Sequence, residues 1–286
     1  YKKNNEKRIQ YVTGLTDERK SVVLRMMNRI KQHSIAVSDE EVRIALDTCE
    51  RRFPEYLLST EKNVEINLTG MPDKVSPSYW KIGQQKIDDV ITKQLEPKTD
   101  EKIIKHISIF ALARIPLLIY LGYRLGDKIP IDVYQKQRNE NEDWIWCKGK
   151  KPVTFTYERI QEGNPKLKKI ILLAAISGKI HLTDLPSFVT SEYTIYEITP
   201  TEVEPHRDII NDKKTLINFK NSYQRLMRLM EKEHGGSNEL LLFPALPLSA
   251  AVYCGRELLQ DTSPMLTIFD RENSKYVKTF SINNKK

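Results

Sequence analysis

The chain has 286 residues, of which 40% are hydrophobic and 29% are charged. These are ordinary values for a globular protein and exclude a mostly disordered or collagen-like chain. A chain of this length also buries enough surface to need no disulfides. The longest apolar run, around residues 115–121, is far shorter than the roughly 18 residues of a membrane span. We therefore expect a soluble protein without a membrane segment.

The charge balance favours anionic partners. Forty-six Lys and Arg residues against 38 Asp and Glu residues give a net charge of +8. Such an excess favours nucleic acids, nucleotides or phosphates as partners. The basic residues are scattered along the chain, so a plain solubilising role for them is an equally good interpretation.

The cysteine content indicates a reducing environment. Cys49, Cys147 and Cys254 are odd in number and lie far apart in the sequence. They exclude a disulfide framework, and no CxxC or HxxxH spacing indicates zinc. The sequence shows no signal-peptide pattern, so the cytoplasm is the expected location. Because the chain begins with Tyr1 rather than Met, we expect further sequence ahead of it.

Residues 1–98 predict a mainly helical segment. A helix is expected from Thr16 to Ile30, because Thr16 is a good N-cap and apolar residues recur at helical spacing. A capping box at 38–41 predicts a second helix, and 76–78 predict the start of a third. One short strand is expected at 64–68. The polar stretch 96–100 contains a helix-stopping Pro and marks the predicted domain boundary.

Residues 99–286 predict a second domain in which strands alternate with helices, which is the pattern of an α/β fold. The expected strands are 106–111, 130–135, 169–176, 193–198 and 240–243. The expected helices are 116–122, 216–230 and 247–259.

An internal repeat is the most informative feature of this domain. Phe110, Tyr120 and Gly122 recur as Phe243, Tyr253 and Gly255, each 133 residues later. Arg138 recurs as Arg271 at the same offset. Unless strand–loop–helix elements match here by chance, the repeat predicts two Rossmann-like halves, 102–200 and 201–286, related by a pseudo-twofold axis.

The repeat also predicts where a ligand binds. In α/β units, ligands lie beyond the carboxyl ends of the strands, where helix N-termini present free N–H groups. The loops 111–116 and 244–247 each lie between a strand and a helix start. Two such loops facing each other would form a two-lobed anion site, whose shape suits a cyclic oligonucleotide.

The residues of the repeat resemble a known family. The stretches HISIFALARIPLL (106–118), GDKIPIDVYQK (126–136), DWIW (143–146), LFPALP (242–247) and AVYCGR (251–256) are similar to the SAVED domain. That domain is the nucleotide-sensing module of CBASS anti-phage effectors and consists of two fused CARF-like halves. The resemblance covers roughly 102–286. Stretches 13–16 and 66–73 resemble the helical segment that joins an HNH endonuclease to its SAVED domain.

The resemblance implies a sensor function. A cyclic di- or trinucleotide, made by a partner cyclase after infection, would bind the domain. Binding would drive oligomerisation and activate a fused effector, here an HNH nuclease that cuts DNA. This sequence contains no His-Asn-His constellation, so DNA would be contacted only through a missing effector domain. The ligand would be a nucleotide, with no cofactor and no metal.

Candidate ligand-binding residues follow the strands of the first half. Ala113, Arg114 and Pro116 form the first loop, where a guanidinium can reach a phosphate. Further candidates are the polar residues after the second strand, which are Gln135, Lys136 and Arg138. Trp146 is a candidate because a tryptophan can stack on a base. The alternative is a solvated loop charge for Arg114, an exposed strand end for the polar residues and a place in the core for the tryptophan. Of the two tryptophans, Trp144 is the one expected in the core.

The other candidates belong to the later strands. Ser177 and Gly178 end a buried strand, so their backbone can approach a nucleotide closely; a plain turn is the alternative. Pro244 and Ala245 are placed in the second loop by the repeat.

No catalytic residue is predicted. The sequence contains no GxGxxG, GxxxxGK[ST], GxSxG or HExxH motif, and no nucleophile–base pair that would support a small-molecule enzyme. The chain is therefore expected not to be an enzyme in itself. The alternative function is that of a basic nucleic-acid-binding domain without a small-molecule ligand, which would bind long DNA with a strong salt dependence.

Overall fold

The computed structural model describes residues 19–30, 33–34, 37–55, 63–137, 143–147, 149, 151–235, 239–258 and 263–283. Within these ranges, no helix is long and apolar enough to cross a membrane. The chain divides into two compact units. The first unit comprises Tyr1–Gly70, Lys86–Leu112 and Lys128–Ile145, and the second comprises Met71–Gln85, Ala113–Asp127 and Trp146–Lys286.

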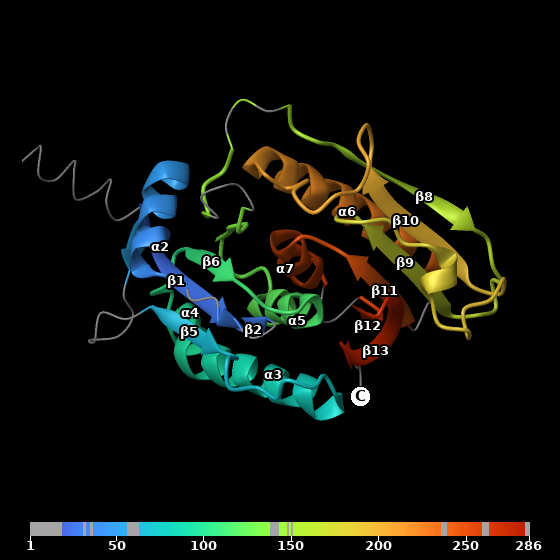
Figure 1. Ribbon diagram of the computed structural model, residues 1–286, viewed down its shortest axis with the longest axis horizontal. Helices are drawn as coiled ribbons and strands as arrows, with labels where there is room; N and C mark the ends of the chain where they lie inside the picture. The colour runs from blue at the N-terminus through green and yellow to red at the C-terminus, as the bar shows by residue number, and fades with distance from the viewer. Residues whose placement is uncertain are drawn as a thin grey trace, which may run out of the picture. The chain divides into compact units, whose positions relative to one another are not determined.

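The first unit is built on a parallel sheet of five strands (Figure 1). Strand β1 (Lys20–Met27) pairs with β4 (Phe53–Glu55), β5 (Val64–Asn67) and β6 (Ile107–Ala111), and β6 pairs with β7 (Ile131–Val133). Its helical elements are α2 (Asp39–Ala45), η1 (Leu46–Glu50), the end of α3 (Pro77–Val90), η2 (Ile91–Leu95) and α4 (Glu96–Asp100). A separate two-stranded ribbon is formed by β2 (Arg29–Ile30) and β3 (His33–Ser34).

The helix predicted between Thr16 and Ile30 is wrong. Thr16 lies outside the described residues, and β1 occupies most of the stretch. Six consecutive residues of β1, from Ser21 to Met26, are buried. A strand inside a parallel sheet reads as a continuous apolar run, and such a run also fits a helical stripe. The described part of this region therefore contains β1 as a strand beside the helices α2 and α3.

The other predictions for this region agree with the structure. Helix α2 follows the capping box at Ser38, α3 begins at Pro77, and β5 covers the predicted strand. The predicted boundary at residues 98 and 99 falls within the span of one sheet, because β1, β4 and β5 precede it while β6 and β7 follow it.

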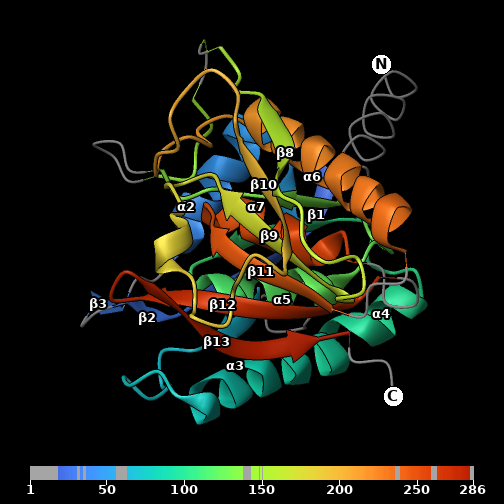
Figure 2. The same ribbon diagram turned by 90° about the vertical axis from the view of Figure 1, so that its right-hand side faces the viewer.

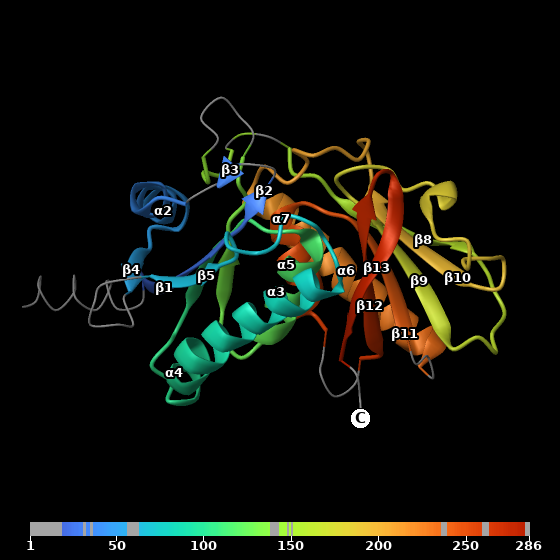
Figure 3. The ribbon, with the colours of Figure 1, turned by 60° about the horizontal axis from the view of Figure 1, so that its bottom comes forward.

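The second unit is built on a six-stranded sheet in the order β13-β12-β11-β9-β10-β8 (Figures 2 and 3). The four central strands are parallel, and the two edge strands β8 and β13 are antiparallel to their neighbours. The strands are β8 (Phe155–Gln161), β9 (Lys169–Ala175), β10 (Thr194–Pro200), β11 (Glu239–Ala245), β12 (Met265–Glu272) and β13 (Lys275–Ile282). The helices are the start of α3, α5 (Ile115–Leu125), η3 (Leu182–Asp184), α6 (Lys213–His234) and α7 (Leu248–Arg256).

The structure confirms an α/β fold with a repeated element. The segments β6–α5–β7 and β11–α7–β12 each run strand, helix and parallel strand. In the first, Phe110 stacks on Tyr134 with ring centroids 4.3 Å apart and meets the edge of Trp144 at 5.3 Å. The second copy has the same geometry: Phe243 stacks on Phe269 at 4.3 Å and meets the edge of Tyr276 at 5.3 Å. All six rings are buried.

The two repeated helices cross at the glycines of the repeat, within the second unit. A Cβ atom on Gly122 would lie 1.9 Å from the carbonyl oxygen of Val252, and one on Gly255 would lie 1.8 Å from that of Ile119. Val252 is itself 133 residues after Ile119, so the contacts are reciprocal. This reciprocity is what a pseudo-twofold axis through the crossing of α5 and α7 produces.

We expect Gly122→Ala to destabilise the chain by about 3 kcal/mol, because the added methyl group cannot fit without separating the two backbones. Chemical denaturation followed by circular dichroism measures the loss. Gly70→Ala is the matched control, since a Cβ there would meet nothing within 4 Å. Equal stability of the two variants would contradict the close crossing.

Candidate functional site

A lysine lies at the carboxyl edge of the first unit's sheet. Lys136 follows the end of β7, two residues after the stacked Tyr134. Its Nζ lies 2.8 Å from Oε1 of Glu41 and 5.6 Å from the ring centroid of Trp144. Only 17% of the Lys136 side chain is exposed. We call Lys136, Glu41 and Trp144 the first cation module.

The carboxylate of this module is held in place by the start of α2. The backbone N–H and hydroxyl of Ser38 both donate to Oε2 of Glu41, each at 2.9 Å, while the Glu41 N–H donates to the Ser38 hydroxyl. Partial burial disfavours the ionised carboxylate, but Lys136 and the Ser38 bonds together outweigh it and hold the pKa of Glu41 below its ordinary value. Oε2 therefore caps the helix, and Oε1 pairs with Lys136.

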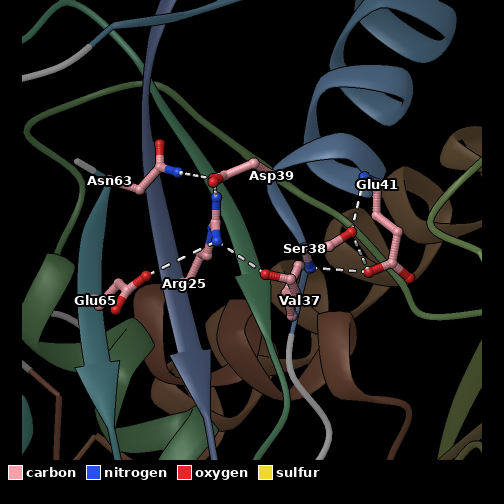
Figure 4. A network of polar contacts seen from close by, with 7 residues as sticks. All are labelled: Arg25, Val37, Ser38, Asp39, Glu41, Asn63 and Glu65. Carbon is pink, nitrogen blue, oxygen red and sulfur yellow. Dashed lines mark hydrogen bonds and ion pairs between the residues drawn. The ribbon is translucent and has the colours of Figure 1, made fainter. Parts of the chain in front are cut away.

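A buried arginine ties the start of α2 to the sheet (Figure 4). Arg25 of β1 donates to the carbonyl of Val37 at 2.9 Å, forms an ion pair with Asp39 and lies 3.8 Å from Glu65. Asn63 donates to the same Asp39 carboxylate. Because Arg25 sits in a central strand, this network fixes the first turn of α2 beside the carboxyl half of β1.

The second unit contains the same arrangement built from different residues. Arg271 lies two residues after the stacked Phe269 of β12. Its Nη2 lies 2.8 Å from Oδ2 of Asp184, and its guanidinium lies 6.0 Å from the ring centroid of Tyr276. Asp184 belongs to η3, which follows β9 just as α2 follows β1. We call Arg271, Asp184 and Tyr276 the second cation module.

Four predicted site residues lie close to this second module. The backbone N–H of Ser177 donates to the carbonyl of Ala245 at 2.8 Å, which joins the ends of β9 and β11. The Tyr276 hydroxyl donates to the carbonyl of Pro244 at 3.2 Å. Gly178, next to Ser177, has open space where a Cβ would lie.

Arg114 forms a separate contact in the second unit. It is the N-cap residue of α5, and its Nη1 donates to Oδ2 of Asp270 at 2.7 Å. Burial raises the pKa of Asp270 above its ordinary value, although the Arg114 guanidinium opposes the rise. Neighbouring residues of a strand point to opposite faces, so Asp270 leaves β12 on the face opposite Arg271. Ala113 and Pro116, on either side of Arg114, are buried.

The remaining candidates differ in exposure. Gln135 is buried and donates to the carbonyl of Lys136, so its amide is used within its own segment. Trp144 is the buried tryptophan, as expected, and Trp146 is half-buried. Arg138 lies outside the described residues. A ligand role for each of these residues stays a prediction.

Sequence reasoning missed Arg271 as a partner of Lys136 in the repeat, the acids Glu41 and Asp184, and the part of the rings Trp144 and Tyr276 in the modules. A signal for the first was present, because both cations stand two residues after a stacked aromatic, in YQK and FDR. The repeat at offset 133 instead aligned Arg271 with Arg138. The acids carry no such signal, since each lies about ninety residues from its cation.

A cavity of about 230 Å³ lies elsewhere in the second unit. Its lining includes Ile170 and Glu239, at the amino ends of β9 and β11, and Met227 and His234 of α6. The cation module lies at the opposite, carboxyl ends of the sheet. Ligands of open α/β sheets bind at carboxyl ends, so we take the modules, rather than this cavity, as the candidate site. Among the residues that the structure describes, no group of three His, Cys, Asp or Glu side chains could hold a metal ion.

These features define a class: a duplicated α/β protein with a cation against an aromatic ring at the carboxyl edge of each sheet. Residues 87–282 match the family of the SMODS-associated and fused to various effectors sensor domain, or SAVED. The match covers more than half of the chain, which therefore belongs to the SAVED family. The expected family is thus confirmed. No curated protein matches the chain.

Two solved structures share the fold. The Cap4 SAVED/CARF-domain receptor of Acinetobacter baumannii with the cyclic trinucleotide 2'3'3'-cAAA matches with a TM-score of 0.57 and 13% identity, over 91% of this chain and 51% of that chain. The same receptor with 3'3'3'-cAAA gives a TM-score of 0.51 and 14% identity, over 78% and 49%. The chain thus spans about half the length of these receptors.

Replacing Arg114 by Gln should leave the buried Asp270 carboxylate without its cation. Without the Arg114 guanidinium, the pKa of Asp270 in the folded protein rises further above its value in the unfolded chain. The variant therefore loses stability as the pH rises through the folded-state pKa, because the buried carboxyl group must then ionise without a partner. We expect a deficit relative to the wild type that is small near pH 4.5 and grows to about 2 kcal/mol near pH 7.5, reduced by the partial exposure of Arg114. Urea denaturation at the two pH values measures it.

The double variant Arg114→Gln/Asp270→Asn is the control. With both charges removed, no unpaired carboxylate stays buried, and most of the stability at neutral pH should return. A deficit of Arg114→Gln that is independent of pH would show that Asp270 does not depend on Arg114.

Proposed function

We propose that the chain is a sensor that binds a cyclic oligonucleotide, and that the cation modules are binding sites for phosphates of such a ligand. The observation that carries the proposal is the duplication of the module. Lys136 and Arg271 occupy equivalent positions, each against an aromatic ring and each at the carboxyl end of a parallel strand.

The chemistry of the modules suits linked nucleotides. Ammonium and guanidinium groups form strong charge-assisted hydrogen bonds with phosphate oxygens, and the guanidinium can do so with two bonds at once. A ring of linked nucleotides carries one phosphate per nucleotide, so it presents repeated anions of the kind that a repeated cation binds. Membership of the SAVED family supports this ligand class, and so does the fold shared with a receptor solved with cyclic trinucleotides.

The wider role rests on the family as well. A partner cyclase would supply the cyclic di- or trinucleotide, and the bound chain would self-associate and so activate an effector joined to it in the full protein. An HNH nuclease is the effector that the sequence resemblance favours. The sensor itself would carry out no chemistry on DNA.

Removing either cation should weaken binding. We expect a cyclic triadenylate to raise the melting temperature of the wild type, because a ligand that binds only the folded state stabilises it. Lys136→Ala and Arg271→Ala should each weaken the affinity by at least about tenfold, the loss of one charged hydrogen bond. Isothermal titration calorimetry measures the affinities.

Lys93→Ala is the matched control for these variants. Lys93 is also paired with a carboxylate, Asp89, at 2.8 Å, but the pair is exposed on η2 and α3. It should bind the ligand as the wild type does. No binding of cyclic di- or trinucleotides, together with tight, strongly salt-dependent binding of duplex DNA, would contradict the proposal and favour the nucleic-acid-binding alternative.

Oligomer-based activation predicts a change of mass. Adding the cyclic nucleotide that binds should raise the apparent mass in multi-angle light scattering by at least a factor of two, because the proposed signal is self-association. A linear trinucleotide of the same base serves as the control. A saturated complex that stays monomeric at all concentrations would contradict this mode of activation while leaving the sensor function intact.

A further inference from the structure

We propose that Glu41 and Asp184 are built-in competitors of the ligand. Each carboxylate forms an ion pair with the cation that a phosphate would bind. A phosphate that binds to a module therefore replaces the carboxylate as the partner of that cation. The inference rests on the proposed function, and it adds the residues that set how tightly the site binds.

The first support is that the acid is duplicated along with the cation. The two ion pairs have the same length, 2.8 Å, although one is Lys with Glu and the other is Arg with Asp. In each unit the acid comes from the first helix after that unit's first parallel strand, α2 after β1 and η3 after β9. The residue types differ, but the chemistry and the place in the topology are the same.

The second support is the environment of the pairs. In each pair one side chain is less than a fifth exposed: Lys136 at 17% and Asp184 at 16%. The surface pair Lys128–Asp100, in contrast, is 74% and 67% exposed. Water therefore compensates the partly buried Lys136 less well when its carboxylate leaves, and a phosphate can take that place. In the second pair the buried partner is the acid, because Arg271 itself is 38% exposed.

The third support is that the exchange need not disturb the helix. Glu41 uses Oε2 for the Ser38 cap and Oε1 for Lys136. Release of Lys136 therefore leaves the capping box intact. The Arg25 network also holds the first turn of α2 in place, since it contacts Val37 and Asp39.

A carboxylate that competes with the ligand lowers the apparent affinity for it. Each acid would thus keep abundant, weakly binding phosphates out of its module. Removing a competing acid should make binding tighter, whereas removing an acid with a purely structural role should leave binding unchanged or weaken it.

The test uses the full chain and a cyclic triadenylate in calorimetric titrations. Glu41→Gln and Asp184→Asn should each tighten binding by about threefold to tenfold, and the double variant should combine the two effects. Gln at position 41 still forms a capping box, so α2 is retained. The matched controls are Glu40→Gln and Asp208→Asn, which remove exposed carboxylates that belong to neither module and should leave the affinity unchanged.

The outcomes separate the two ideas. If the wild type binds and both acid variants bind equally well or more weakly, with melting temperatures close to the wild type, the competition is disproved while the sensor function stands. If the wild type binds no cyclic oligonucleotide, the proposed sensor function is wrong, and the inference that depends on it is wrong as well. Because the two variants lie in different units, misfolding of one, seen by circular dichroism, leaves the other as a complete test.

Discussion

Among the described glycines, the two at the crossing of α5 and α7 leave the least room for a side chain. Gly122 and Gly255 each face a carbonyl of the other helix at a distance that no side chain can occupy. Each helix is the central element of one copy of the repeat, since β6 leads into α5 and β11 leads into α7. A single crossing that requires glycine on both sides therefore fixes how the two repeated helices pack within the second unit. It also explains why glycine is among the few residue types that the copies share at a fixed offset.

The copies share chemistry more closely than they share residues. Phe110 and Phe243 have identical stacking distances, but their partners are Tyr and Trp in one copy and Phe and Tyr in the other. The cation and the acid also change type while their separation stays the same. Packing rings and ion pairs tolerate such exchanges when shape and charge are kept. A candidate site defined by charge and position can thus be found in the structure although the two copies differ in sequence.

The sequence predicted the repeat, the family and most elements of the second unit, because these depend on local patterns. It failed at β1, where burial on both sides of a parallel strand removes the alternation that marks a strand. It missed the equivalence of Lys136 and Arg271, because their offset is 135 rather than 133 and a two-residue difference in loop length is enough to hide it. The acids Glu41 and Asp184 were beyond prediction for another reason. A contact between residues that are 95 or 87 positions apart depends on the tertiary fold, and no local spacing encodes it.

The pseudo-symmetry is broken at the cations of the two modules. The first module presents an ammonium, which is a compact charge without a fixed direction, whereas the second presents a planar guanidinium that binds oxygens in pairs. Arg114, which neutralises the buried Asp270 beside Arg271, has Pro247 as its counterpart 133 residues later, and proline offers no charge. Under the proposed function, phosphates of the same kind would thus meet unequal partners. Arg271 would set the orientation of a phosphate, while Lys136 would add charge, so loss of Arg271 should affect the choice among ligands more than loss of Lys136.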